Sequence, residues 1–222
     1  MLDPHLLGSD GRPDTDQRDT VPLGPVGRCP DRPVLTIGIA DDSGSVTAPG
    51  GSDPVSGRYR EMGLALRAVA KSCRCKRELA ALVHFDTPHG DVGPQRLNKA
   101  GFIALRTGLR VPLGGIGTSD LLPALSKAQQ LATAHPDHDV VALIFSDFEF
   151  TDPDPAAVLG ALEEFPGQVF GCMLGRTGTD RITGVDRVVA VDAADPSGTV
   201  ANVLLDVLTV HRPGGGSGGQ MA

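Results

Sequence analysis

Short apolar runs alternate with amphipathic segments along the middle of the chain. Residues 34–40, 79–85 and 140–145 are almost entirely apolar and have the length of single strands. A strand that lacks polar alternation is typical of a parallel sheet, where both faces are buried. Two further short runs, at residues 169–174 and 188–191, predict additional strands of the same kind.

Segments with helical spacing separate these runs. Apolar side chains recur at intervals of three and four residues, which predicts one amphipathic helix in each segment: residues 62–73, 121–131, 158–165 and 200–208. Asp154 and Pro155 fit the N-cap and the first position of the third helix. The second helix is expected to start near Ser119. Residues 86–117 have a weaker pattern, and we expect a strand within 102–113 followed by a Gly-rich loop.

The alternation of strands and helices predicts the fold class. Parallel strands need long crossover connections, and helices usually provide them. We therefore expect an α/β protein with a doubly wound, mainly parallel sheet and helices on both faces. In such a sheet, ligands bind outside the carboxyl ends of the strands.

The two ends of the chain lack this pattern. Residues 1–31 are rich in Asp, Gly and Pro, and residues 212–222 are rich in Gly. Such segments bury too little apolar surface to offset the entropy lost on ordering. We expect a flexible N-terminal arm over 1–31, one domain over 32–211, and a flexible tail over 212–222.

The composition excludes several classes of protein. The 222 residues are 40% hydrophobic and carry a net charge of −7, which argues against nucleic-acid binding. No apolar run approaches the roughly 18–20 residues of a membrane span. The N-terminus lacks the apolar centre of a signal peptide, so we expect a cytoplasmic protein without membrane contact.

The four cysteines are too few and too irregular for a disulfide scaffold. Cys73 and Cys75 are separated by a single residue, which is too tight for the chelating pair of a zinc ribbon, and no second pair exists. We interpret the four cysteines as structural thiols, with a metal or redox role as the alternative.

Oxygen-bearing side chains gather where the predicted strands end. Residues 41–45 read Asp-Asp-Ser-Gly-Ser and follow the first strand, and Ser146 and Asp147 follow the strand at 140–145. A third cluster, Gly-Thr-Ser-Asp at 117–120, precedes a helix. Oxygen ligands without His or Cys select a hard cation such as Mg²⁺. Only the carboxylates supply charge, so one further anionic ligand could still bind the ion.

Asp41, Ser43 and Ser45 after a first strand resemble the metal-ion-dependent adhesion site of von Willebrand factor A (VWA) domains. The Gly-Thr-Ser-Asp loop and the strand that ends in Asp147 resemble the other two parts of that site, in the same order. The resemblance covers roughly residues 33–210 and points to bacterial intracellular members of the family. It implies a Rossmann-like VWA fold and a site for Mg²⁺, or for Mn²⁺ or Ca²⁺.

The resemblance also implies a function. Such a domain binds a partner protein whose Asp or Glu reaches the metal, and it catalyses nothing. Intracellular bacterial members commonly work beside ring-shaped ATPases in stress, chaperone or conflict systems. This sequence has no phosphate-binding G-x-x-x-x-G-K-[ST] motif, so any such ATPase is a separate protein.

This sequence departs from the family pattern at three positions. Either Thr118 or Ser119 fits the hydroxyl position of the loop, with a slight preference for Ser119. Phe148 stands where the family usually has Gly after the last Asp, which predicts a bulkier rim. Asp42 adds an acidic group that would repel an acidic partner if it pointed outward.

His84, within a predicted strand, is expected to be a core residue.

Two alternative functions remain open. A metal-dependent hydrolase of the phosphatase type could use Asp41 as its nucleophile, although Ser43 stands where dehalogenase-like phosphatases place a second Asp. A VWA scaffold could instead keep the fold and leave the metal site empty. Asp41 could then act as a turn cap, with the serines making local hydrogen bonds.

Overall fold

A sheet of six strands forms the centre of the computed structural model, which describes residues 21–53, 57–85, 88–110, 117–175, 181–192 and 194–215. The strand order is β3-β2-β1-β4-β5-β6, and every neighbouring pair is parallel except β2 with β3. The strands are β1 (Val34–Ala40), β2 (Leu79–His84), β3 (Val92–Arg96), β4 (Asp139–Ser146), β5 (Gln168–Leu174) and β6 (Arg187–Val191).

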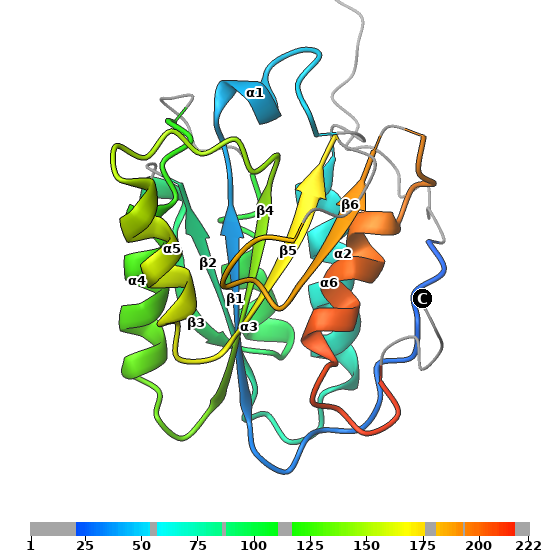
Figure 1. Ribbon diagram of the computed structural model, residues 1–222. Helices are drawn as coiled ribbons and strands as arrows, with labels where there is room; N and C mark the ends of the chain where they lie inside the picture. Colours follow the sequence, from blue (N-terminus) through cyan, green and yellow to red (C-terminus); the bar gives the residue numbers. More distant parts are fainter. Residues whose placement is uncertain are drawn as a thin grey trace, which may run out of the picture.

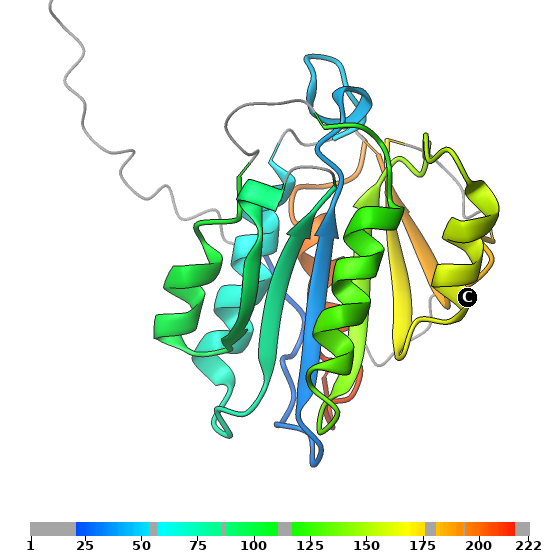
Figure 2. The same cartoon turned by 90° about the vertical axis from the view of Figure 1, so that its left-hand side faces the viewer.

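Helices cover both faces of this sheet (Figures 1 and 2). Helices α4 and α5 lie on one face, while α2, α3 and α6 lie on the other. The helical elements are α1 (Gly44–Thr47), α2 (Arg58–Ser72), the 3-10 turn η2 (Pro88–Gly90), α3 (Lys99–Leu105), α4 (Leu122–Thr133), α5 (Pro155–Glu163) and α6 (Thr199–Leu208). The expected α/β fold with a mainly parallel, doubly wound sheet is therefore confirmed.

The two central strands, β1 and β4, hold the two layers together. They pair in register from Val34 opposite Asp139 to Ala40 opposite Phe145. Alternate side chains enter opposite cores: Leu143 packs with α2 and α6, whereas Ile144 packs with α4 and α5. Burial on both faces explains why the sequence of these strands is apolar without alternation.

The expected strand within residues 102–113 is wrong. Residues 99–105 form α3, because the Asn98 side chain caps the helix by accepting a hydrogen bond from the Gly101 amide at 3.0 Å. The edge strand is β3 instead, and the sequence analysis missed it since Val-Gly-Pro-Gln-Arg carries almost no apolar signal. An edge strand tolerates Pro94 because one of its sides is unpaired. Residues 111–116, which include most of the expected Gly-rich loop at 113–117, lie outside the described residues.

The packed part of the chain begins before residue 32, where we expected the domain to start. Leu23 and Val26 pack against the core on the α6 side of the sheet. The Asn202 side chain on α6 holds this segment by accepting from the Gly24 amide and donating to the Pro22 carbonyl, each at 3.2 Å. Residues 1–20 of the expected arm lie outside the described residues.

The C-terminal boundary also differs from the expectation. Arg212 is 4% exposed, and its guanidinium pairs with the buried Glu78 carboxylate. Val26 and Gly215 form an antiparallel bridge, so the two ends of the domain pair with each other. Residues 216–222 of the expected tail lie outside the described residues.

Within the described ranges, every helix is too short or too polar to cross a bilayer.

Buried Glu61 joins α2 to the start of α6, which lie side by side in Figure 1. Its carboxylate accepts hydrogen bonds from the amides of Gly198 at 2.7 Å and Ala201 at 3.2 Å. Gly198 is the N-cap of α6 and Ala201 lies in its first turn, where N–H groups have no partner within the helix. A carboxylate also interacts favourably with the positive end of the helix dipole.

Replacing Glu61 should therefore destabilise the fold. We expect Glu61→Ala to lower the free energy of unfolding by about 3 kcal/mol, because it leaves buried amides without an acceptor. Glu61→Gln keeps one acceptor oxygen and should cost less. Urea denaturation measures both. The matched control is the exposed Glu163 on α5, for which an alanine should change stability by less than about 0.5 kcal/mol. Equal effects at the two positions would contradict this role of Glu61.

Candidate functional site

The three predicted oxygen clusters meet at the carboxyl edge of the sheet. The Asp41 amide donates to the Phe145 carbonyl at 3.0 Å, which extends the β1–β4 ladder by one residue. The Ser146 hydroxyl then donates to Asp41 Oδ2 at 2.6 Å. Ser43 forms an isolated parallel bridge with Gly117, which brings the 117–120 segment to the same edge.

The turn after β1 is organised by its own side chains. Asp41 Oδ1 accepts a hydrogen bond from the Ser43 amide at 2.9 Å. Ser43 is the N-cap of α1, and its Oγ lies 3.0 Å from the Oγ of Ser45. Ser43 is buried and Ser45 is exposed, so this pair of hydroxyls runs from the interior to the surface.

Asp147 follows β4 and faces the same region. Its Oδ1 accepts from the Glu149 amide at 3.1 Å, and its Oδ2 accepts from the Ser52 hydroxyl at 3.2 Å. Asp147 and Ser45 both line an open cavity of about 650 Å³. The cavity gives a ligand access to this end of the sheet. The remaining lining residues are Gly50, Gly51, Ser52, Glu149, Leu174, Gly175, Asp192 and Ala194.

The two alternative loop hydroxyls have different surroundings. Thr118 is exposed, and its Oγ1 accepts a hydrogen bond from the Asp120 amide at 3.3 Å. Ser119 is 8% exposed, and its carbonyl accepts from the Thr151 amide at 3.2 Å. The Asp152 carboxylate caps the following helix by accepting from the amides of Leu121 and Leu122. Helix α4 therefore begins later than the expected start near Ser119.

Asp41 and Asp147 place two negative charges at this edge. Asp41 is completely buried, and its pKa is raised above the ordinary value for Asp. Burial is the main cause, and the charge of Asp147 adds to it. Hydrogen bonds from Ser146 and Ser43 act in the opposite direction. In the described part of the chain, neither carboxylate forms an ion pair with a Lys, Arg or His side chain. Two uncompensated carboxylates with neighbouring hydroxyls fit a hard divalent cation.

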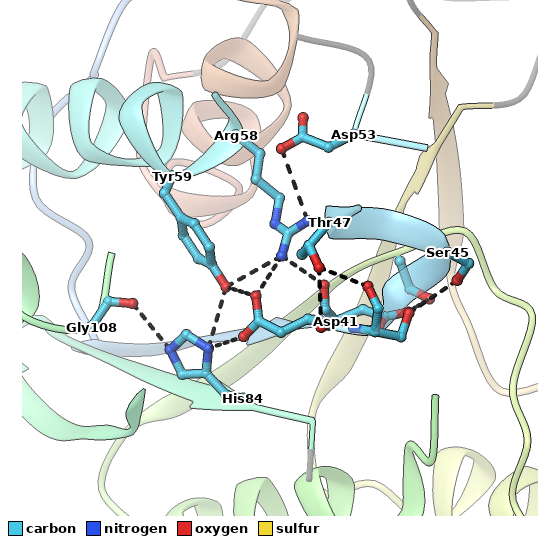
Figure 3. Close-up of polar contacts among 11 residues, drawn as sticks. Asp41, Ser45, Thr47, Asp53, Arg58, Tyr59, His84 and Gly108 are labelled. Carbon is cyan, nitrogen blue, oxygen red and sulfur yellow. Dashed lines mark hydrogen bonds and ion pairs between the residues drawn. The ribbon is translucent and has the colours of Figure 1, made fainter. Parts of the chain in front are cut away.

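Asp42 points inward. It is completely buried, and its Oδ1 accepts from Arg58 at 2.7 Å and from the Tyr59 hydroxyl at 2.6 Å. Figure 3 shows Arg58, Tyr59 and His84 pointing toward one another. Repulsion of an acidic partner was expected only if Asp42 pointed outward, and this condition is not met. The sequence could not show this, since Arg58 comes from α2, sixteen residues later in the chain.

His84 is a core residue, as expected. It is 3% exposed, with Nδ1 2.6 Å from Asp42 Oδ2 and Nε2 3.0 Å from the Gly108 carbonyl. The Arg58 guanidinium also donates to the Asp41 carbonyl at 2.6 Å. Asp42, Arg58, Tyr59 and His84 thus form a buried network that holds the turn carrying Asp41 from the interior of the protein.

Phe148 adopts a left-handed backbone conformation with φ of 61°. This conformation is costly for a bulky residue and free for Gly, the residue that usually follows the last Asp in VWA domains. The ring packs beside Phe150, with centroids 5.4 Å apart, and against the core on the α4 and α5 side. It does not line the 650 Å³ cavity, so the expected bulkier rim is wrong.

Two features of the structure were not anticipated from the sequence. Ser52 donates to Asp147 from a loop that carries no recognisable motif. Cys29, Cys73 and Cys75 come together with Glu78 at the opposite edge of the sheet. The only sequence signal for this second cluster was the short spacing of Cys73 and Cys75, and Cys29 lies 44 residues before Cys73.

Several solved structures share this fold, and one of them is a von Willebrand factor type A protein. The pilus adhesin SpaC from Lactobacillus rhamnosus GG matches with a TM-score of 0.64 at 12% identity, over 83% of this chain and 31% of the adhesin. A von Willebrand factor type A protein from Catenulispora acidiphila matches with a TM-score of 0.57 at 16% identity, over 81% and 42%. The manganese-loaded TRAP protein of Plasmodium vivax matches with a TM-score of 0.55 at 13% identity, over 82% and 74%.

These likenesses show that the chain has the VWA fold. The chain spans less than half the length of the adhesin and of the Catenulispora protein. No family model and no curated protein matches the sequence.

The buried network generates a prediction about stability. Asp42→Asn should lower the free energy of unfolding by about 3–5 kcal/mol, because it removes the nearer counter-charge of the buried Arg58 and leaves only Asp53, at 4.0 Å. Thermal or urea denaturation measures the loss. Asp137→Asn, at an exposed loop position, is the matched control and should change stability by less than about 0.5 kcal/mol. An Asp42→Asn protein as stable as this control would mean that the ion pair does not support the turn.

Proposed function

We propose, from the VWA fold and the chemistry at the carboxyl edge of its sheet, that this chain is a metal-dependent protein-interaction module. The observation that carries the proposal is the pair of carboxylates, Asp41 and Asp147, which lie beside serine hydroxyls without a basic partner in the described structure. Asp41, Ser43, Ser45 and Asp147, with Ser119 or Thr118, would hold Mg²⁺ or a similar divalent ion. The bound ion would supply a positive centre for an acidic side chain of the partner.

Charge balance supports this role. The two carboxylates offset the charge of a divalent ion, and the hydroxyls add none. An Asp or Glu of a partner can therefore bind as a further anionic ligand, because Mg²⁺ favours oxygen donors and exchanges some of its waters for them. Mg²⁺, Mn²⁺ and Ca²⁺ all bind oxygen ligands of this kind, and the proposed ion is Mg²⁺ or one of the other two.

The surroundings of Asp41 favour binding over catalysis. A nucleophilic carboxylate must reach a substrate atom, whereas Asp41 is completely buried and both of its oxygens accept hydrogen bonds. The buried carboxylate is suited to hold charge beneath an ion and is poorly placed to attack. We therefore propose that the module is not an enzyme.

The cavity beside the site indicates what kind of partner surface would fit. Glu149 and Asp192 line it together with Asp147, so the rim is acidic. Complementary charge favours association, and like charges disfavour it. The proposed partner accordingly presents one carboxylate to the metal within a neutral or basic surface. A separate ATPase, as in intracellular VWA systems, is the partner class that the resemblance suggests.

The first test is metal binding by the purified chain. Isothermal titration with Mg²⁺ and Mn²⁺ should reveal one site, and Asp147→Asn should weaken it more than about tenfold, because ligand charge sets affinity at such sites. At a hundredfold excess over Kd the metal should stabilise the fold by about 2.7 kcal/mol. Of Ser119→Ala and Thr118→Val, the variant that binds the metal more weakly identifies the loop ligand.

Asp137→Asn is the control and should bind the metal as the unchanged chain does. Absence of binding at millimolar metal would overturn the proposal.

The second test is partner binding. A partner captured from native lysate with Mg²⁺ should be released by EDTA and lost with Ser43→Ala or Asp147→Asn, while Asp137→Asn retains it. Replacing each exposed Asp of the captured partner by Asn, and each exposed Glu by Gln, should identify the carboxylate that reaches the metal. Retention in EDTA would show that another face binds. Hydrolysis of a generic phosphate ester that requires Asp41 would show an enzyme instead.

A further inference from the structure

The amino edge of the sheet, opposite the site above, carries a cluster of sulfur ligands. Cys29 precedes β1, Cys73 is the C-cap of α2, Cys75 lies in the following turn, and Glu78 directly precedes β2. One ligand atom from each of the four residues lies within 4.8 Å of all the others. Four ligand atoms thus converge from two distant segments of the chain.

The distances from Cys73 to the other two sulfurs are those of neighbouring ligands in a tetrahedral site. Cys73 Sγ lies 3.8 Å from Cys29 Sγ and 3.6 Å from Cys75 Sγ. Zinc with Zn–S bonds of about 2.3 Å places neighbouring sulfurs about 3.8 Å apart, at the edges of a tetrahedron. Glu78 Oε2 lies 3.1 Å from Cys73 Sγ and 3.8 Å from Cys75 Sγ. A disulfide would need sulfurs about 2.05 Å apart, and all three cysteines are free.

We propose that Cys29, Cys73, Cys75 and Glu78 bind a zinc ion. Thiolate ligands select zinc among the common divalent ions, whereas Mg²⁺ and Ca²⁺ prefer oxygen. Four protein ligands complete the tetrahedron, which is the arrangement of a structural rather than a catalytic zinc site. The interpretation of these three cysteines as independent structural thiols is replaced by this proposal.

The groups around the cluster hold the ligands in place. The Arg212 guanidinium donates from Nε to Glu78 Oε1 at 2.9 Å and from its other arm to Oε2, which orients the carboxylate. The Cys75 amide donates to Cys29 Sγ at 3.3 Å. Ligands of protein zinc sites are commonly fixed by such outer hydrogen bonds.

The turn between the ligands has an unusual backbone conformation. Lys76, in the turn between the ligands, has a left-handed backbone with φ of 56°. Such strain in a non-glycine residue persists where the surroundings hold the turn, often at ligand sites.

Zinc has a route to the cluster. A cavity of about 840 Å³ lies beside it, lined by Cys29 and Cys75 together with Lys71 and Arg74. The basic side chains offset the negative charge that three thiolates and one carboxylate would give to a divalent ion. Zinc here would fasten the segment before β1 to the turn after α2, far from the carboxyl edge. The proposal is therefore independent of the proposed interaction function.

The test uses the full chain, purified under reducing conditions. Elemental analysis should find one zinc per chain, and Co²⁺ exchanged into the protein should give the visible absorption of tetrahedral cobalt with a thiolate charge-transfer band. Cys29→Ala and Cys75→Ala should each lose the bound zinc and the cobalt spectrum. Both side chains are only partly buried, so these variants should remain folded.

Two matched controls separate this site from other effects. Cys172 is completely buried in the core, where burial raises its pKa to about 12, and Cys172→Ala should keep the zinc. Asp147→Asn should also keep it, because that residue lies at the other edge of the sheet. The proposal is overturned if the chain neither retains zinc nor binds it on titration. It is also overturned if folded Cys29→Ala and Cys75→Ala proteins keep the metal, or if mass spectrometry of the unreduced chain finds a disulfide among the three cysteines.

Discussion

The parallel pairing of β1 with β4 is the interaction on which the rest of the structure depends. Both strands are buried on both faces, so each contributes side chains to two cores that the sheet separates. Their register runs unbroken to Ala40 opposite Phe145 and continues through the hydrogen bond from the Asp41 amide. Because parallel strands end at one edge, this register brings the carboxylates that follow them together. A slip in the register would separate Asp41 from Ser146 and Asp147.

Asp41, Asp42 and Asp147 lie near that edge, and their different surroundings give them different roles. Asp42 is neutralised within the protein by Arg58 and bound by Tyr59 and His84, so its charge supports the turn. Asp41 and Asp147 have hydrogen-bond donors but no basic partner in the described structure. Burying a charge without compensation is costly. The proposed divalent ion would supply this compensation, and the partner's carboxylate would in turn complete the ligand set of the ion.

The two edges of the sheet carry ligands of opposite chemical character. The carboxyl edge offers carboxylates and hydroxyls beside an acidic cavity, whereas the amino edge offers three sulfurs and one carboxylate beside a basic one. A hard ion such as Mg²⁺ would therefore bind at the carboxyl edge and a thiophilic ion such as Zn²⁺ at the amino edge, because the ligand types differ. Residues 21–31 and Arg212 matter at the amino edge, because they bring Cys29 to the cluster and orient Glu78. The segments at both ends of the domain thus help to form the cysteine cluster.

The sequence by itself determined the α/β fold, the bounds of β1, and the segments at the carboxyl edge. It could do so because burial on both faces requires continuous apolar runs, and because a parallel sheet places the residues after its strands at one edge. Tertiary structure alone decided the direction of Asp42, since its counter-charge comes from another helix. It also decided the docking of residues 21–31 and the meeting of Cys29 with Cys73 and Cys75. These features depend on contacts between segments far apart in the chain, and neither periodicity nor local spacing records which distant side chains will face one another.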